Sequence, residues 1–162
     1  MPFRVLFVCS GNTCRSPLAE GIARRVLAAH ANGTFAVESA GTFAETGGVA
    51  SSGSLEVARE NGLDLEAFQS RQLTEALLDA ADLVLVMEPA HRSVVLGVRP
   101  TADTKTLLLG ELSGKQGRDA SVPDPFGGPI ESYRRTFQRL DTLIREGLPR
   151  LFEMAERKAE EA

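Results

Sequence analysis

Cys9 and Arg15, separated by five residues, are the residues of this chain whose types and spacing point most directly to chemistry. An apolar run, Val5 to Val8, precedes them, and a pattern typical of a helix follows from Pro17 to Ala29. A loop between a strand and a helix can turn backbone N–H groups inward and add the positive end of the helix to an anion site. The spacing therefore predicts a phosphate cradle with a thiol at its base.

The residues inside the loop fit that cradle. Gly11 has no Cβ, and Asn12 tolerates a left-handed backbone better than most residues do. The planar guanidinium of Arg15 can hold two phosphate oxygens. Donors that bind a phosphate would also stabilise a Cys9 thiolate, and Ser16 is placed to donate a further hydrogen bond to the sulfur. The alternative for Cys9 is a small buried residue that only packs at a strand end.

Strands and helices must position this loop, and their patterns alternate along the chain. We predict strands over residues 4–8, 35–40, 82–87 and 104–109 and helices over 17–29, 55–61, 74–78, 89–96 and 130 to about 160. This alternation favours a parallel sheet with helices on both faces, which binds ligands at the carboxyl ends of its strands. The predicted fold is one three-layer α/β domain over residues 1–162, with a four-stranded parallel sheet and the phosphate-binding loop after the first strand.

Several residues mark the ends of these elements. Asn32-Gly33 predicts the end of the first helix, and Thr74 is a candidate N-cap. Residues 41–53 and 114–128 are predicted loops because Gly, Ser, Thr and Pro gather there. Pro149 leaves open whether the last helix is continuous near Gly147.

Composition narrows the classes of function. The chain has 162 residues, 43% hydrophobic and 25% charged, as in an ordinary globular protein, and a net charge of −4 that disfavours nucleic acid and anionic membranes as partners. Its apolar runs are too short for a membrane span or a signal peptide, so a cytoplasmic location is expected. Both cysteines lie in the loop, which fits a reducing compartment.

The string from Cys9 to Glu20 resembles the low-molecular-weight protein phosphatase family. Further segments that fall in the family's order extend the resemblance from Val5 to about Leu151: residues 39–42, 70–74, 82–87 and 124–126. It implies a small cytoplasmic phosphatase with a cysteinyl-phosphate intermediate, no metal and no other cofactor. Phosphorylated proteins would be its substrates, and the loop would bind phosphate-like anions.

The resemblance also implies roles for individual residues. Cys9, Arg15 and Asp124 are the predicted catalytic residues, with Asp124 as general acid; alone, Asp124 in an Asp-Pro pair could equally be a turn former. The predicted substrate-binding residues are Ser10, Gly11, Asn12, Thr13, Cys14 and Phe126, and Ser16 and Ser39 are predicted to support the loop. Cys14 either packs under the loop or forms a reversible disulfide with Cys9.

One position departs from the family's pattern. The family's asparagine in this loop bonds to nearby serines and a histidine, and Phe68 stands at the histidine position. This departure puts the hydrogen-bond network around Asn12 in doubt.

His30 and His91 have no partner at metal-ligand spacing and are predicted to be surface residues on helices. Tyr133 is predicted to pack the last helix.

Thr13 and Phe126 indicate which phosphorylated residue the enzyme would act on. Threonine at this position and a single Asp-Pro-Phe-Gly-Gly segment resemble the bacterial protein arginine phosphatases, which favours phosphoarginine. Tyrosine-specific relatives usually carry an aliphatic residue at the Thr13 position and paired aromatics after Asp-Pro, so phosphotyrosine is the runner-up. An arsenate reductase would need a further cysteine near Met87, where the chain has none. A non-catalytic phosphate-binding module is disfavoured because Cys9, Arg15 and Asp124 are all present.

Overall fold

Four parallel strands form the central sheet of the computed structural model, which describes residues 1–31 and 33–162. The strand order is β2-β1-β3-β4. Because the chain leaves β1 toward β2 and later crosses to β3 on the other side, the carboxyl end of β1 lies at the switch point where such sheets bind ligands. The strands are β1 Phe3–Cys9, β2 Phe35–Gly41, β3 Leu83–Val86 and β4 Thr106–Leu108.

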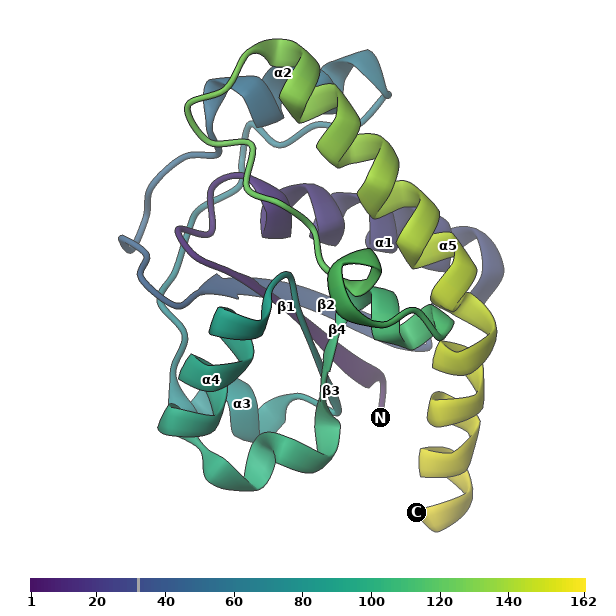
Figure 1. Ribbon diagram of the computed structural model, residues 1–162. Coiled ribbons are helices and arrows are strands. Elements are labelled where there is room, and N and C mark those ends of the chain that lie inside the picture. Colours follow the sequence, from purple (N-terminus) through teal and green to yellow (C-terminus); the bar gives the residue numbers. More distant parts are fainter. Residues whose placement is uncertain (32) are drawn as a thin grey trace.

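Helices cover both faces of this sheet, so the molecule has three layers (Figure 1). Helices α1 and α5 lie on one side, and α3 and α4 lie on the other. Three short 3₁₀ helices join the later elements: Pro100–Lys105, Leu109–Ser113 and Gly117–Ala120. The α-helices are α1 Arg15–Ala31, α2 Ser52–Glu60, α3 Glu75–Ala80, α4 Pro89–Val98 and α5 Ile130–Glu161.

Alternating side chains of β1 supply both halves of the core. Phe3, Val5 and Phe7 pack into the cluster on the α1–α5 side, whereas Leu6 and Val8 pack into the cluster on the α3–α4 side. A strand buried on both faces reads as a continuous apolar run, which is why this segment shows no polar alternation. The rigid strand therefore delivers Cys9, its last residue, to a fixed place at the end of the sheet.

The predicted α/β architecture is confirmed, and the boundaries differ in detail. The Thr74 side chain caps α3 by accepting from the Leu77 N–H, as predicted. Helix α2 begins at Ser52, three residues earlier than predicted, because the Ser51 side chain caps it. The predicted helix end at Asn32 lies outside the described residues. Within the described part of the chain, no helix is long and apolar enough to cross a membrane.

Helix α5 runs without interruption through Pro149, so Pro149 does not end it. A proline inside a helix removes one backbone hydrogen bond. Packing outweighs that loss here, since Phe137, Leu140 and Ile144 are buried against the core and Gly147 lies directly against Leu112. The same helix carries the buried Tyr133, as predicted.

Candidate active site

The loop of residues 10–14 joins the end of β1 to the start of α1. Cys9 is buried at the end of the strand, and its Sγ lies 2.9 Å from Ser16 Oγ in the first turn of the helix. Among the residues that the structure describes, no backbone carbonyl accepts from the N–H groups of residues 11–14. Unpaired N–H groups beside a helix N-terminus are the donors that an oxyanion site requires.

Asn12 holds the shape of this loop. Its φ of 56° is the left-handed conformation predicted for it, and its side chain is fully buried. The Oδ1 atom accepts from the Arg71 backbone N–H at 2.9 Å, so Nδ2 is the donor to Ser16 Oγ at 2.8 Å and to Ser39 Oγ at 3.0 Å. The network around Asn12 is thus complete without a side chain from position 68. Phe68 instead lies half-buried against the core.

The segment after β2 fixes the loop from its other side. Thr42 and Phe43 donate backbone hydrogen bonds to the carbonyls of Cys9 and Ser10, both at 2.9 Å. Gly41 makes this close approach possible, because a Cβ there would lie 2.4 Å from the Ser10 carbonyl oxygen. The loop is therefore clamped between α1 and the chain that leaves β2.

Arg15 lies beneath the loop with its side chain almost wholly buried. Its Nη1 donates to the Val122 carbonyl at 2.8 Å and lies 3.3 Å from Glu88 Oε2. Its Nη2 lies 3.7 Å from Asp124 Oδ2. The Nε atom is buried and makes no hydrogen bond with any described residue. Partners on two other segments thus hold the guanidinium in place while leaving a donor unused.

His91 belongs to this site, and the prediction that it is a surface residue is wrong. Only 3% of it is exposed, and its Nε2 lies 2.9 Å from Ser10 Oγ. Its Nδ1 accepts from the Glu88 backbone N–H at 3.0 Å, so Nε2 carries the proton and donates to Ser10. Burial, assisted by the charge of Arg15, lowers the pKa of His91 to about 4. The ring is therefore neutral near pH 7, and it leaves the Ser10 hydroxyl hydrogen free to donate.

Sequence reasoning missed Glu88 and His91, although a signal was present. Both residues lie at the start of α4, which comes soon after β3, and β3 pairs with β1 in parallel. The carboxyl ends of neighbouring parallel strands meet at one edge of the sheet, so polar residues after β3 belong beside those after β1. His30, in contrast, is exposed as predicted, with its Nδ1 beside the Val26 carbonyl oxygen.

A small cavity of about 220 Å³ opens above the loop. Asp124 and Phe126 line its mouth, and the predicted loop residues except Asn12 line its base: Cys9, Ser10, Gly11, Thr13, Cys14 and Arg15. Asp124 accepts from the Phe126 backbone N–H at 3.0 Å, which fixes the turn between the two residues. The structure thus brings residues from two segments that are distant in the sequence to one pocket. Asn12, Ser16 and Ser39 lie behind it.

Cys14 points toward helix α5. Its Sγ lies 3.3 Å from Ser51 Oγ and 3.9 Å from the Tyr133 hydroxyl. Cys9 and Cys14 are both free, buried thiols. Tyr133 in turn packs against Gly53, where any Cβ would meet the ring at 2.6 Å. These contacts fit the packing role predicted for Cys14, and the disulfide with Cys9 stays a prediction.

A buried thiol in an anion-binding loop, a buried arginine and a carboxylate at the mouth define a cysteine-based phosphatase on an α/β sheet. Residues 4–160 match the low molecular weight phosphotyrosine protein phosphatase family, and the chain belongs to it. Members of this family are hydrolases that act on phosphorylated proteins.

Individual relatives divide between two substrates. The chain is 40% identical to a protein-arginine-phosphatase of Geobacillus stearothermophilus, over 89% of this chain and 93% of the relative. It is 39% identical to the low molecular weight protein-tyrosine-phosphatase PtpB of Staphylococcus haemolyticus, over 87% and 94%. The structure of the arginine phosphatase YwlE from Geobacillus stearothermophilus aligns with a TM-score of 0.81 and 37% identity, over 99% of this chain and 95% of that one.

Proposed function

We propose that this cysteine-based phosphatase hydrolyses phosphoarginine in proteins. The observation that carries the proposal is Thr13, whose half-buried side chain lines the pocket wall next to Cys9. A phosphorylated arginine presents a polar, planar guanidinium beside the phosphorus, and a threonine hydroxyl can form a hydrogen bond with it. Phe126, at the mouth, offers a ring on which that plane can stack. The similarity to arginine phosphatases supports the same assignment.

In the first step, Cys9 Sγ attacks the phosphorus, so that an S–P bond forms as the P–N bond to the guanidinium breaks. Arg15 and the loop N–H groups hold the phosphoryl oxygens, where the charge of the transition state is spread. Ser10 donates its free hydroxyl hydrogen to the same anion. Asp124 supplies the proton that the leaving nitrogen requires.

In the second step, water attacks the phosphocysteine. Asp124 takes a proton from that water, the S–P bond breaks, and inorganic phosphate leaves. Cys9 departs as a thiolate, which Ser16 stabilises by donating its hydroxyl hydrogen, since its oxygen already accepts from Asn12. The residues of the loop thus serve both steps, and no metal or other cofactor takes part.

Substitution of Thr13 tests the substrate. Thr13→Ile removes the hydroxyl and keeps the β-branch. The substitution leaves the backbone unchanged, so the carbonyl of residue 13 can still accept from the Ser51 N–H. An unpaired substrate N–H in a closed pocket costs about 1–3 kcal/mol, so kcat/KM for phosphoarginine should fall roughly ten- to hundredfold. Turnover of phosphotyrosine should hold or rise, because an aryl ring packs better on an aliphatic wall.

Thr13→Ser is the matched control, because it retains the hydroxyl and should keep the preference for phosphoarginine. Both substrates are measured with each variant and with the wild-type enzyme. A wild-type enzyme that prefers phosphotyrosine by tenfold or more would overturn the proposal in favour of a tyrosine phosphatase.

A further inference from the structure

Strand β2 forms an open edge of the sheet. The strand order places β2 and β4 at the two edges, and β2 has seven residues whereas β4 has three. On the outer side of β2, the described part of the chain adds only an isolated bridge between Gly41 and Gln72, at the carboxyl end of the strand. A long edge strand presents a row of backbone groups with which another chain can pair. Residues 35–39 are therefore the part of this sheet most open to such pairing.

The backbone hydrogen bonds show which groups of β2 point away from the sheet. The Phe3 N–H of β1 donates to the Thr34 carbonyl at 2.8 Å. In a parallel pair, every second residue of a strand directs its backbone groups to the same neighbour. The even-numbered residues of β2 therefore face β1, and Val37 and Ser39 face outward. A strand added at this edge would pair with the N–H and carbonyl groups of these two residues.

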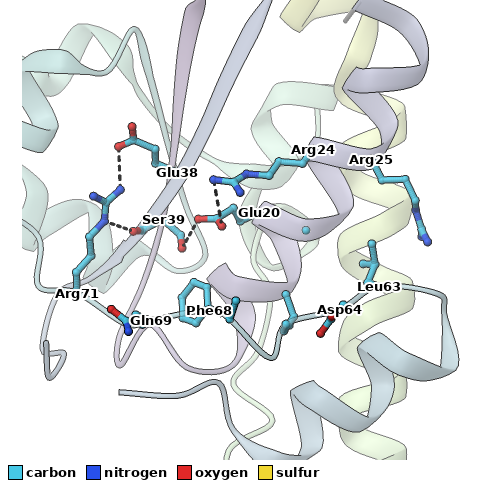
Figure 2. Close-up of a pocket in the computed structure, with 13 residues that line it drawn as sticks. Glu20, Arg24, Arg25, Glu38, Ser39, Leu63, Asp64, Phe68, Gln69 and Arg71 are labelled. Atoms are coloured by element: carbon cyan, nitrogen blue, oxygen red, sulfur yellow. Dashed lines mark hydrogen bonds and ion pairs between the residues drawn. The ribbon is translucent and has the colours of Figure 1, made fainter. Parts of the chain in front are cut away.

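Two arginine side chains occupy the outward carbonyls. Arg24 on α1 donates twice to the Val37 carbonyl, from Nε at 3.2 Å and from Nη2 at 2.8 Å. Arg71 donates from Nε to the Ser39 carbonyl at 3.0 Å, and Figure 2 shows it reaching the strand from the segment that follows Phe68. The N–H groups of Val37 and Ser39 have no protein acceptor among the described residues. The acceptors of this edge are thus in use, and its donors are open.

Carboxylates hold both guanidinium groups along the edge. Glu38 binds Arg71 at 2.8 Å, and the mostly buried Glu20 lies 3.5 Å from Arg24 (Figure 2). Residues of β2 and Arg24 line two cavities, of about 790 Å³ and about 360 Å³. The space beside the edge is therefore not filled by another helix or strand of the described chain, and the two arginines are what closes it.

We propose that Arg24 and Arg71 keep the outer edge of β2 from pairing with a second copy of this chain. Their guanidinium groups occupy the carbonyls that an added strand needs, and they lie where its backbone would run. A second copy is the partner that the bare edge fits, because it supplies a strand of the same length in a two-fold, self-complementary pair. Residues 35–37 are Phe-Ala-Val, in which the aromatic and β-branched side chains favour strand pairing.

The double variant Arg24→Ala/Arg71→Ala tests the proposal by sedimentation velocity and amide hydrogen exchange. It should form a dimer whose fraction rises with protein concentration, whereas the wild-type protein should show no association through this edge. In the dimer, the amides of Val37 and Ser39 should exchange at least about tenfold more slowly than in wild type, because they acquire acceptors. The exchange measurement therefore reports where the two copies meet, not only that they associate.

Two further double variants serve as controls. Arg24→Lys/Arg71→Lys should stay monomeric, because an ammonium group can still donate to the outward carbonyls. Arg25→Ala/Arg157→Ala removes two arginines that have no hydrogen bond to β2 among the described residues. Arg25 donates instead to the Asn61 carbonyl, and Arg157 is exposed on α5. This variant should also stay monomeric, which separates the role of the edge from a general effect of lost charge.

Partial unfolding is a different route to association, and hydrogen exchange distinguishes it. Unfolding would speed exchange at Leu85 in the central strand β3, whereas edge pairing slows β2 and leaves β3 unchanged. Should the double variant not fold, Arg24→Ala alone frees the Val37 carbonyl and should show the same slowing at that residue. The proposal is overturned if the folded variant stays monomeric, if it associates without slower exchange in β2, or if either control associates to the same extent.

Discussion

Cys9 is the residue on which the proposed chemistry depends most directly. Cys9→Ser should abolish turnover, because a hydroxyl is a far weaker nucleophile than a thiolate at neutral pH. Vanadate binding should remain measurable, since Arg15 and the loop are unchanged. Steady-state kinetics and vanadate titration check both expectations. Activity above about a hundredth of wild type would contradict the proposed intermediate.

Asp124 is tested by the leaving group. Asp124→Asn should slow hydrolysis about 10²–10⁴-fold for substrates with poor leaving groups, because these require a proton. Substrates with good leaving groups should lose much less. Asp119→Asn, an exposed change in the preceding 3₁₀ helix, serves as the control. Equal losses for both kinds of substrate would remove Asp124 from the role of acid.

Close backbone contacts hold the elements around the loop together. One of the closest is made by Gly41 at the end of β2. A Cβ there would lie 2.4 Å from the Ser10 carbonyl oxygen and 2.9 Å from the Asn12 nitrogen. Gly41→Ala must therefore displace the loop, and we expect weaker vanadate binding and a loss of about 1–3 kcal/mol in the free energy of unfolding.

Gly97→Ala is the matched control for Gly41→Ala. Gly97 lies inside α4 with no atom near its missing Cβ, so alanine should be neutral or stabilising there. Vanadate titration and urea unfolding of the two variants separate the effect of the close contact from the general effect of replacing a glycine. Normal vanadate binding by Gly41→Ala would contradict the conclusion that the close approach at Gly41 fixes the position of the loop.

Over the whole molecule, buried titratable groups make stability depend on pH. The pKa of His91 falls from its ordinary 6.5 to about 4 in the folded protein. Between these values the unfolded chain binds a proton that the folded chain does not, so stability is lost as pH falls through this window, by on the order of 3 kcal/mol. Glu20 acts oppositely, because its raised pKa favours the folded state as pH falls.

His91→Gln isolates the histidine's contribution. Glutamine does not titrate, and its amide can both accept from Glu88 and donate to Ser10. Urea unfolding at pH 7 and at pH 4.5 should show a smaller loss of stability for this variant than for wild type. The same loss in both proteins would mean that His91 does not remain neutral in the folded state.

Residue types and their spacing were enough to predict the part of the site that is local in the sequence. Cys9, Asn12, Arg15 and Ser16 lie within eight consecutive residues, so a strand, a tight loop and a helix start are enough to place them together. The apolar run of β1 and the alternation of elements likewise predicted the parallel sheet, because burial on both faces leaves a direct signature in residue type.

The distant groups that complete the site could be identified only from the folded chain. His91 meets Ser10 across 81 positions of sequence, and the Val122 carbonyl meets Arg15 across 107. Neither contact is signalled by a periodicity or a motif in the sequence, because each depends on which distant segments the fold brings side by side. The link from Glu20 to Ser39 is of the same kind, since a helix on one face and a neighbouring strand meet only once the sheet has formed.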